Sequence, residues 1–85
     1  MDLRMYLVNA RQNKGYSQRR TARESGVSYQ HYAKIENGDR GRKVSFQTIG
    51  RIAAVLDISL DDLYQLEKVY LEEVELSHES KLYWF

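Results

Sequence analysis

The sequence predicts an all-α fold of five helices with an extended C-terminal helix or tail, and three observations support that prediction. The 85 residues contain no proline, so a common helix breaker is absent. Apolar residues recur every three to four positions along most of the chain, which is the period of an amphipathic helix. Serines suited to N-caps and glycines suited to helix ends separate these segments. A chain of this length has room for one core.

The first helix is expected over residues 3–13. Asp2 precedes it, where a carboxylate favours the free N–H groups of a first turn, and Gly15 follows its end. The apolar residues that share its inner face are Leu3, Leu7 and Ala10.

Two short helices with a tight turn between them are expected next. Ser17 caps the first of them, and Gly26 ends it because glycine adopts the left-handed conformation without a Cβ penalty. Ser28 caps the second, which runs over residues 29–36 and is closed by Gly38. The second helix is rich in hydrogen-bonding side chains, and a basic loop follows it. This is the layout of a helix-turn-helix that reads DNA with its second helix.

The remaining chain predicts two further helices. Ser45 caps the fourth, and Ser59 caps the fifth, with acids in its first turn where the helix dipole favours them. The fifth helix is expected to continue to about Leu76, with a break at residues 77–80. Residues 82–85 are too apolar for a free tail and are expected to dock. The inward-facing residues of the fourth helix are Ile49, Ile52, Ala53 and Leu56.

Several short motifs follow one another in a fixed order along roughly residues 3–66. They are Asn9-Ala10-Arg11, Lys14-Gly15-Tyr16-Ser17-Gln18, Gly26-Val27-Ser28, Ile35-Glu36-Asn37-Gly38, Phe46-Gln47-Thr48-Ile49, Ile52-Ala53 and Leu56-Asp57-Ile58-Ser59-Leu60-Asp61-Asp62-Leu63. This ordered set resembles the Cro/repressor (XRE-type) helix-turn-helix family of transcriptional regulators. The resemblance implies a five-helix Cro/repressor-like domain over residues 1–66, sequence-specific binding to double-stranded DNA, and usually a homodimer. Residues 67–85 then form a C-terminal extension.

Charge is divided unevenly along the chain, although the net charge is only +1. Residues 1–43 hold ten Lys and Arg against four acids, whereas residues 44–85 hold three against eight. One half can therefore face phosphate while the other faces away. The alternative is two ordinarily solvated surfaces.

The resemblance implies a set of DNA contacts. Gln18 matches a position that grips a phosphate together with the helix N-terminus. Tyr29, Gln30 and Lys34 match positions that read base edges, where Gln pairs with adenine and Lys donates to guanine. Each residue also has a plain alternative as a solvated surface side chain. The expected DNA-contacting residues are Gln18, Arg19, Ser28, Tyr29, Gln30, His31, Lys34, Arg40, Arg42 and Lys43.

Other matched positions are expected to be structural. In the family, the pair equivalent to Arg11 and Glu36 forms a salt bridge between the first and third helices, which suits the fork geometry of arginine. Tyr32 matches a core position. Thr21 and Ser25 depart from the family, which usually has Leu at both positions, and so weaken the core between the second and third helices unless tyrosines fill the space.

The C-terminal apolar stripe allows two interpretations. It either forms a two-fold dimer interface on the side away from DNA or folds back onto its own chain. The dimer interpretation assigns the interface to Leu66, Tyr70, Val74, Trp84 and Phe85.

Several functions have little support in the sequence. Glu75 and His78 resemble half of a di-metal motif whose second copy is absent, and no nucleophile–base pair or phosphate loop appears, so catalysis, a metal and a cofactor are not expected. The chain has no cysteine and no apolar run of membrane-spanning length, so a cytoplasmic protein of bacterial or phage origin is expected. The main alternative to a stand-alone repressor is an antitoxin or another protein-interaction module that binds a partner protein through the acidic, aromatic C-terminal segment.

Overall fold

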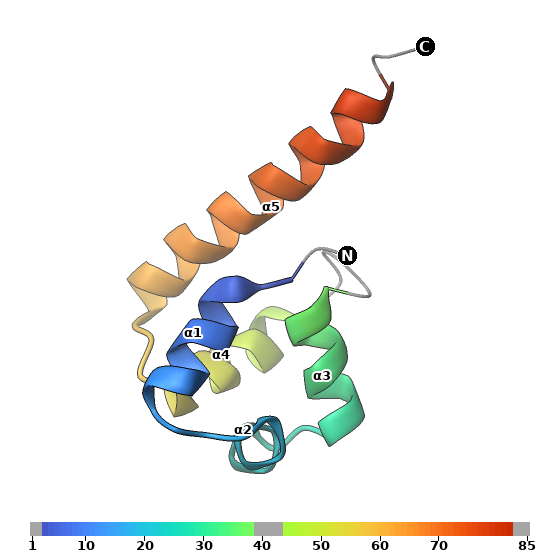
Figure 1. Cartoon of the computed structure of the whole chain (residues 1–85). Coiled ribbons are helices and arrows are strands. Elements are labelled where there is room, and N and C mark those ends of the chain that lie inside the picture. The colour runs from blue at the N-terminus through green and yellow to red at the C-terminus, as the bar shows by residue number, and fades with distance from the viewer. Residues whose placement is uncertain (1–2, 39–43, 83–85) are drawn as a thin grey trace.

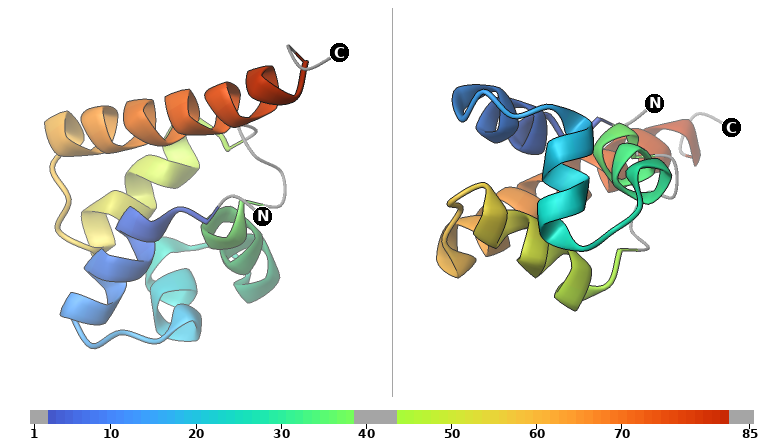
Figure 2. Two further views of the ribbon diagram at one scale, coloured as in Figure 1. Left: turned by 45° about the horizontal axis from the view of Figure 1, so that its top comes forward. Right: turned by 90° about the horizontal axis from the view of Figure 1, so that it is seen from below.

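The computed structural model describes residues 3–38 and 44–82, and the side chains of that part up to residue 75. Five helices follow one another without a strand in this part of the chain, as the sequence predicted (Figure 1). Helix α5 lies across the body formed by the other four and projects beyond it (Figures 1 and 2). It lies on the side away from α2 and from the N-terminal end of α3. The helix bounds are α1 Met5–Asn13, α2 Gln18–Ser25, α3 Tyr29–Asn37, α4 Phe46–Val55 and α5 Leu60–Leu82.

The predicted caps of α2 to α5 are confirmed. Each N-cap serine accepts a hydrogen bond from the backbone N–H three residues later, at 3.0 Å for Ser17 and 3.1 Å for Ser28, Ser45 and Ser59. Gly26 and Gly38 both have φ of 73°, the left-handed conformation expected after α2 and α3. The boundaries of the helix-turn-helix are therefore set by local chemistry in the sequence.

The predicted start of α1 is wrong. The helix begins at Met5, with Arg4 in the N-cap position and without a side-chain cap, so Asp2 is too far upstream to cap it. Asp2 itself lies outside the described residues. Leu3 precedes the helix and is 45% exposed, so it does not join the inner face. Arg4 is drawn inward by contacts with distant residues, which a local reading of the sequence does not contain.

The predicted end of α5 is also wrong. The helix runs through residues 77–80 to Leu82 (Figure 1). The segment is polar and contains two serines. Such residues cost only a few tenths of a kcal/mol in a helix, against about 1 for glycine and 3 for proline, and neither occurs there.

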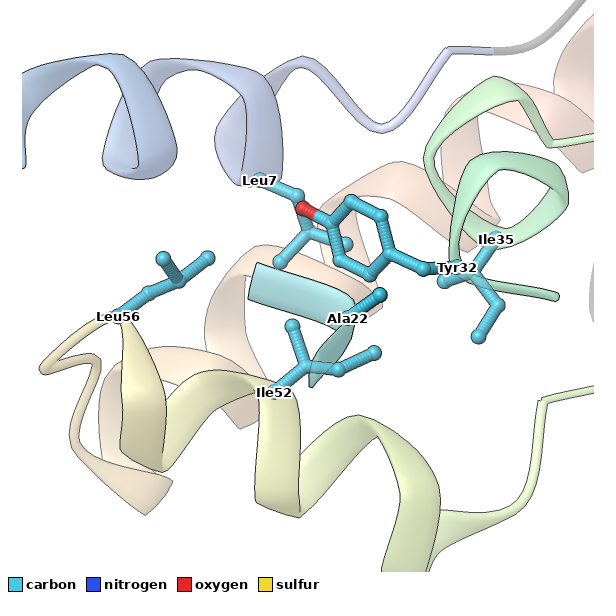
Figure 3. Close-up of a cluster of buried hydrophobic side chains, with 6 residues drawn as sticks. All are labelled: Leu7, Ala22, Tyr32, Ile35, Ile52 and Leu56. Carbon is cyan, nitrogen blue, oxygen red and sulfur yellow. The ribbon is translucent and has the colours of Figure 1, made fainter. Parts of the chain in front are cut away.

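The main core joins α1, α2, α3 and α4. Tyr32 is completely buried, and its ring lies among side chains of the other three helices (Figure 3). The six buried residues of this cluster are Leu7, Ala22, Tyr32, Ile35, Ile52 and Leu56. A smaller cluster of Ile49, Ala53 and Leu63 seats α5 on α4.

Thr21 and Ser25 are both buried, at positions where the family that the sequence resembles usually has leucine. The Thr21 hydroxyl donates to the Ser17 carbonyl at 2.9 Å, whereas the Ser25 hydroxyl has no hydrogen-bond partner among the described residues. Tyr32 belongs to the main core and Tyr16 packs against that core, so tyrosines supply apolar volume there.

We expect Ser25→Ala to raise the free energy of unfolding by about 1 kcal/mol, because it removes a buried hydroxyl without a partner. Urea unfolding followed by circular dichroism measures the change. Thr21→Val is the matched control, and it should destabilise because it removes a hydroxyl that is bonded. Equal effects of both changes would contradict the assignment.

Candidate nucleic-acid interface

The turn between α2 and α3 sets the angle of the second helix. Gly26 takes the left-handed conformation, Val27 is half-buried against the main core, and Ser28 caps α3 directly afterwards. The N–H of Val27 donates to the Ala22 carbonyl at 3.0 Å, which closes the end of α2. The two helices are thereby fixed on one side of the body.

Helix α3 presents a polar surface along its outer side. Gln30, His31 and Lys34 are exposed, whereas Tyr32 and Ile35 on the same helix are buried. The exposed side chains offer amide, imidazole and ammonium donors, which suit base edges and phosphates. The N-terminal end of α3 is directed away from α5 (Figure 1).

Arg19 and Tyr29 form a stacked pair between α2 and the start of α3. The Arg19 guanidinium carbon lies 4.3 Å from the centre of the Tyr29 ring. Stacking leaves the N–H donors in the guanidinium plane available for hydrogen bonds. It also covers one face of the ring, which limits how Tyr29 can pack against a thymine methyl group. Both residues were predicted from the sequence to contact DNA, but their stacking on each other was not predicted.

Gln18 is the first residue of α2, and its side chain also makes a hydrogen bond within the protein. Its Nε2 donates to Glu36 Oε1 at 2.9 Å. This bond uses one of the two amide N–H groups and holds the side chain in place, leaving the other N–H and the amide oxygen available. Gln18 is therefore a bridge from α2 to the end of α3, a role that the sequence analysis missed.

Arg11 and Glu36 form the salt bridge that the family resemblance implied. The guanidinium donates through Nε to Oε2 at 3.0 Å and through Nη2 to Oε1 at 3.1 Å. The Tyr32 hydroxyl donates to the same carboxylate at 2.6 Å. Burial on its own would raise the pKa of Glu36, but the hydrogen bonds from Arg11, Tyr32 and Gln18 outweigh it, and the pKa lies below its ordinary value. Glu36 is thus held as a carboxylate that joins three helices.

A second ionic cluster, centred on Arg4, was missed by the sequence analysis. Arg4 is completely buried and donates to the Glu67 carboxylate through Nε at 3.0 Å and Nη2 at 2.9 Å. Its Nη1 donates to the Ile35 carbonyl at 2.8 Å, and its backbone N–H donates to the Glu36 carbonyl at 2.9 Å. The Tyr6 hydroxyl also donates to Glu67, at 2.6 Å. The cluster ties the C-terminal end of α3 to α5.

Burial and bonding keep the Tyr6 hydroxyl protonated. Burial raises the pKa of Tyr6, and its hydrogen bond to Glu67 raises it further. Arg4 also packs against α5 through its guanidinium carbon, which lies 4.4 Å from the Tyr70 ring centre. Nothing in the local sequence around residue 4 indicates these contacts, since Glu67 is 63 positions away.

The residues assigned to a dimer interface are not all at the surface. Tyr70 is 7% exposed and Val74 is 6% exposed, so both pack within their own chain, which corrects their assignment to a two-fold interface. Leu66 is 38% exposed and remains available. Trp84 and Phe85 lie outside the described residues, as do Arg40, Arg42 and Lys43 of the basic loop.

Helix α2, the turn and α3 form a helix-turn-helix, and a comparison of the sequence with known families finds the same motif. A family model described as helix-turn-helix matches residues 7–63. The chain belongs to the helix-turn-helix family. This family membership confirms the resemblance to the Cro/repressor (XRE) type and the all-α fold.

A curated relative of this helix-turn-helix protein is the HTH-type transcriptional regulator SlrR of Bacillus subtilis (strain 168). The two are 34% identical over 70 residues, which cover 82% of this chain and 45% of SlrR. The chain thus spans less than half the length of this relative. No solved structure gives a significant match.

Among the described residues, no group of three or more His, Cys, Asp or Glu is arranged to hold a metal ion. No helix in the same part of the chain has both the length and the apolar character needed to cross a bilayer.

Proposed function

We propose that this helix-turn-helix protein is a sequence-specific regulator of transcription, acting as a repressor that binds an inverted-repeat operator as a homodimer. The observation that carries the proposal is the exposed polar side of α3, which is held at its far end by two buried ionic clusters. A helix fixed in this way keeps its side chains in one position relative to the major groove. Membership of a family of DNA-binding transcriptional regulators supports it. Such a protein works in the cytoplasm, as a non-catalytic DNA-binding protein of bacterial or phage origin.

Within this proposal the residues divide into two groups. Gln30 and Lys34 read base edges, because both are exposed on α3 and have the donors and acceptors that adenine and guanine require. The others contact phosphates and fix the register of the complex. These positioning residues are Gln18, Arg19, Ser28, His31 and, in the basic loop, Arg40, Arg42 and Lys43. Tyr29, which the resemblance placed among the base readers, joins them here because its ring is stacked against Arg19 and its hydroxyl can reach a phosphate.

Selection of bound duplexes from a random DNA pool tests the proposal. We expect an inverted repeat whose half-sites lie about 34 Å apart, one turn of the double helix. The expectation follows from two α3 helices related by a two-fold axis. If no common sequence is enriched by a protein shown to be folded, the proposed function is wrong.

Substitutions should separate the reading residues from the positioning residues. We expect Gln30→Ala and Lys34→Ala each to weaken binding to the selected site by about 1–3 kcal/mol, with little effect on random DNA. Arg42→Ala should weaken binding to both and reduce the salt dependence. DNA-binding titrations at several salt concentrations measure these effects. Gln65→Ala is the control, because Gln65 is an exposed residue of α5. A loss of the same size on both kinds of DNA for Gln30→Ala contradicts its role as a reader.

A second candidate function is binding of a partner protein, as in an antitoxin. The supporting observation is the acidic α5, which also exposes Leu66 at 38% and Val69 at 50%. Purification of the chain with a stable partner from its native host would favour this function. A free homodimer with nanomolar affinity for its operator would favour the stand-alone repressor.

A further inference from the structure

Arg51 of α4 reaches the turn between α2 and α3. Its side-chain atom Nη1 lies 3.7 Å from the point that a Cβ atom would occupy at Gly26. Gly26 is the residue that ends α2, and Ser28, the N-cap of α3, follows it by two positions. The positive charge of Arg51 therefore lies beside the turn that leads into the helix proposed to enter the major groove.

The guanidinium of Arg51 is free to bind an anion. Arg51 is exposed, and no carboxylate among the described residues pairs with it. By contrast, Arg4, Arg11 and Arg20 are all held in ion pairs within the chain. A guanidinium presents a planar set of N–H donors that matches the oxygens of a phosphate.

Gln18 and Arg51 lie at opposite ends of α2. Seen from below, α2 runs from the side of α1 toward α4, so α4 lies beyond its carboxyl end (Figure 2). The eight residues of α2 give it a length of about 12 Å. The major groove of B-DNA is also about 12 Å wide. With α3 in the groove, the two ends of α2 therefore face the phosphates of the two strands.

We propose that Arg51 contacts a DNA phosphate on the strand opposite the one that Gln18 contacts, so that α2 is anchored to the DNA at both ends. The proposal rests on the proposed DNA binding and adds a residue of α4 to the residues that position the protein. Arg51 lies outside the helix-turn-helix motif itself, and the sequence analysis counted it only as one of the few basic residues of the acidic half of the chain.

The helix dipole explains why a cation is needed at this end of α2. The amino end of a helix carries a partial positive charge of about 0.5 elementary charge, and the carboxyl end carries a partial negative charge of the same size. The amino end, at Gln18, therefore attracts a phosphate, whereas the carboxyl end repels one. The full charge of Arg51 outweighs the partial charge beside Gly26, and Arg23 in the last turn of α2 adds to it.

The salt dependence of DNA binding tests the proposal. Each phosphate contact contributes about 0.9 to the slope of log K against log salt concentration. We expect Arg51→Ala to reduce this slope by about 0.9 for each bound copy of the chain, and to weaken binding about eightfold per copy at about 0.1 M salt. Fluorescence-anisotropy titrations of a labelled duplex at several salt concentrations measure both effects. The losses should be similar on the selected site and on random DNA.

Three further variants serve as controls. Arg51→Lys keeps the charge and should retain most of the slope. Lys68→Ala removes an exposed cation from α5, on the side away from α2, and should leave the slope unchanged. Circular dichroism confirms that each variant is folded, and Arg51→Gln takes the place of Arg51→Ala if the alanine variant does not fold. An unchanged slope in the folded neutral variant, or an equal reduction in Lys68→Ala, overturns the proposal.

Phosphate ethylation of the selected duplex locates the contact. Ethylation of one phosphate in each half-site, on the strand opposite the Gln18 contact, should weaken binding of the natural chain but not of Arg51→Ala. The same interference pattern in both proteins overturns the proposal, and shows that Arg51 only stabilises the carboxyl end of α2.

DNA selection separates this proposal from the proposed function. If a common sequence is enriched while Arg51→Ala keeps the natural slope, only the Arg51 contact is wrong. If no sequence is enriched but the slope on random DNA falls in Arg51→Ala, the Arg51 contact stands and sequence-specific regulation is wrong. A folded chain that binds no DNA overturns both.

Discussion

Arg4→Ala is expected to lower the free energy of unfolding by about 3–5 kcal/mol, the usual cost of breaking a buried ion pair by removing one partner. Arg4 is completely buried and makes a forked pair with Glu67. Its removal leaves the Glu67 carboxylate and the Ile35 carbonyl without their charged donor. The penalty is large because these groups have little access to water, the Glu67 side chain being only 19% exposed.

Denaturant unfolding of Arg4→Ala beside Arg20→Ala measures this effect. Arg20 makes an ion pair with Glu24 at 2.7 Å, but the two side chains are 48% and 37% exposed. Exposed pairs of this kind contribute about 0–1 kcal/mol. Each variant therefore loses one arginine and one ion pair, and the two lost ion pairs differ in how deeply they are buried. Similar losses of stability in both would show that the Arg4 cluster does not hold α5 to the body.

The contrast between these two arginines shows what the sequence could predict. The serine caps and the glycine at position 26 were predicted because each acts within four residues of itself, where spacing determines geometry. Arg4 looked like any charged residue near a chain start. Its burial depends on Glu67 and on the end of α3, which meet only after the chain has folded.

The C-terminal stripe shows a second limit of prediction. Tyr70 and Val74 are buried like Leu63, and the three residues follow one another at helical spacings of seven and four, so they share one apolar face of α5. Spacing does not say whether such a face packs against its own chain or another. The pairing of Arg4 with Tyr70, 4.4 Å from the ring centre, helps to place this face on its own body. Leu66, farther round the helix, stays partly exposed.

The candidate nucleic-acid interface was predictable to a similar extent. Family motifs identified Gln30 and Lys34, which the structure exposes on α3, and Arg11 and Glu36, which it pairs. The motifs did not indicate that Gln18 and Tyr32 complete the same carboxylate site. An aliphatic side chain at the position of Tyr32 would pack in the core but could not donate a hydrogen bond to Glu36.

Glu36→Gln is expected to lower the free energy of unfolding by about 3 kcal/mol at neutral pH. The change keeps the size of the side chain but removes the charge that faces Arg11. The Glu36 side chain is 3% exposed and that of Arg11 is 14% exposed, so water compensates the remaining guanidinium only in part. Glu24→Gln is the matched control, because it removes the same charge from an exposed pair and should cost less than about 1 kcal/mol.

The effect of Glu36→Gln should also depend on pH in a definite direction. The folded-state pKa of Glu36 lies below its ordinary value, because hydrogen bonds from Arg11, Tyr32 and Gln18 outweigh the opposing effect of burial. A lowered carboxylate pKa contributes stability that is fully present above the unfolded pKa, about 4.3, and is lost as the pH falls through the folded value. Unfolding at a series of pH values should therefore show a constant gap between the natural chain and Glu36→Gln from neutrality to about pH 5.5. The gap should narrow below about pH 4, as Glu36 becomes protonated and resembles glutamine. A gap that is independent of pH down to the acid transition would mean that the loss comes from altered packing, and that the charge of Glu36 does not hold the end of α3.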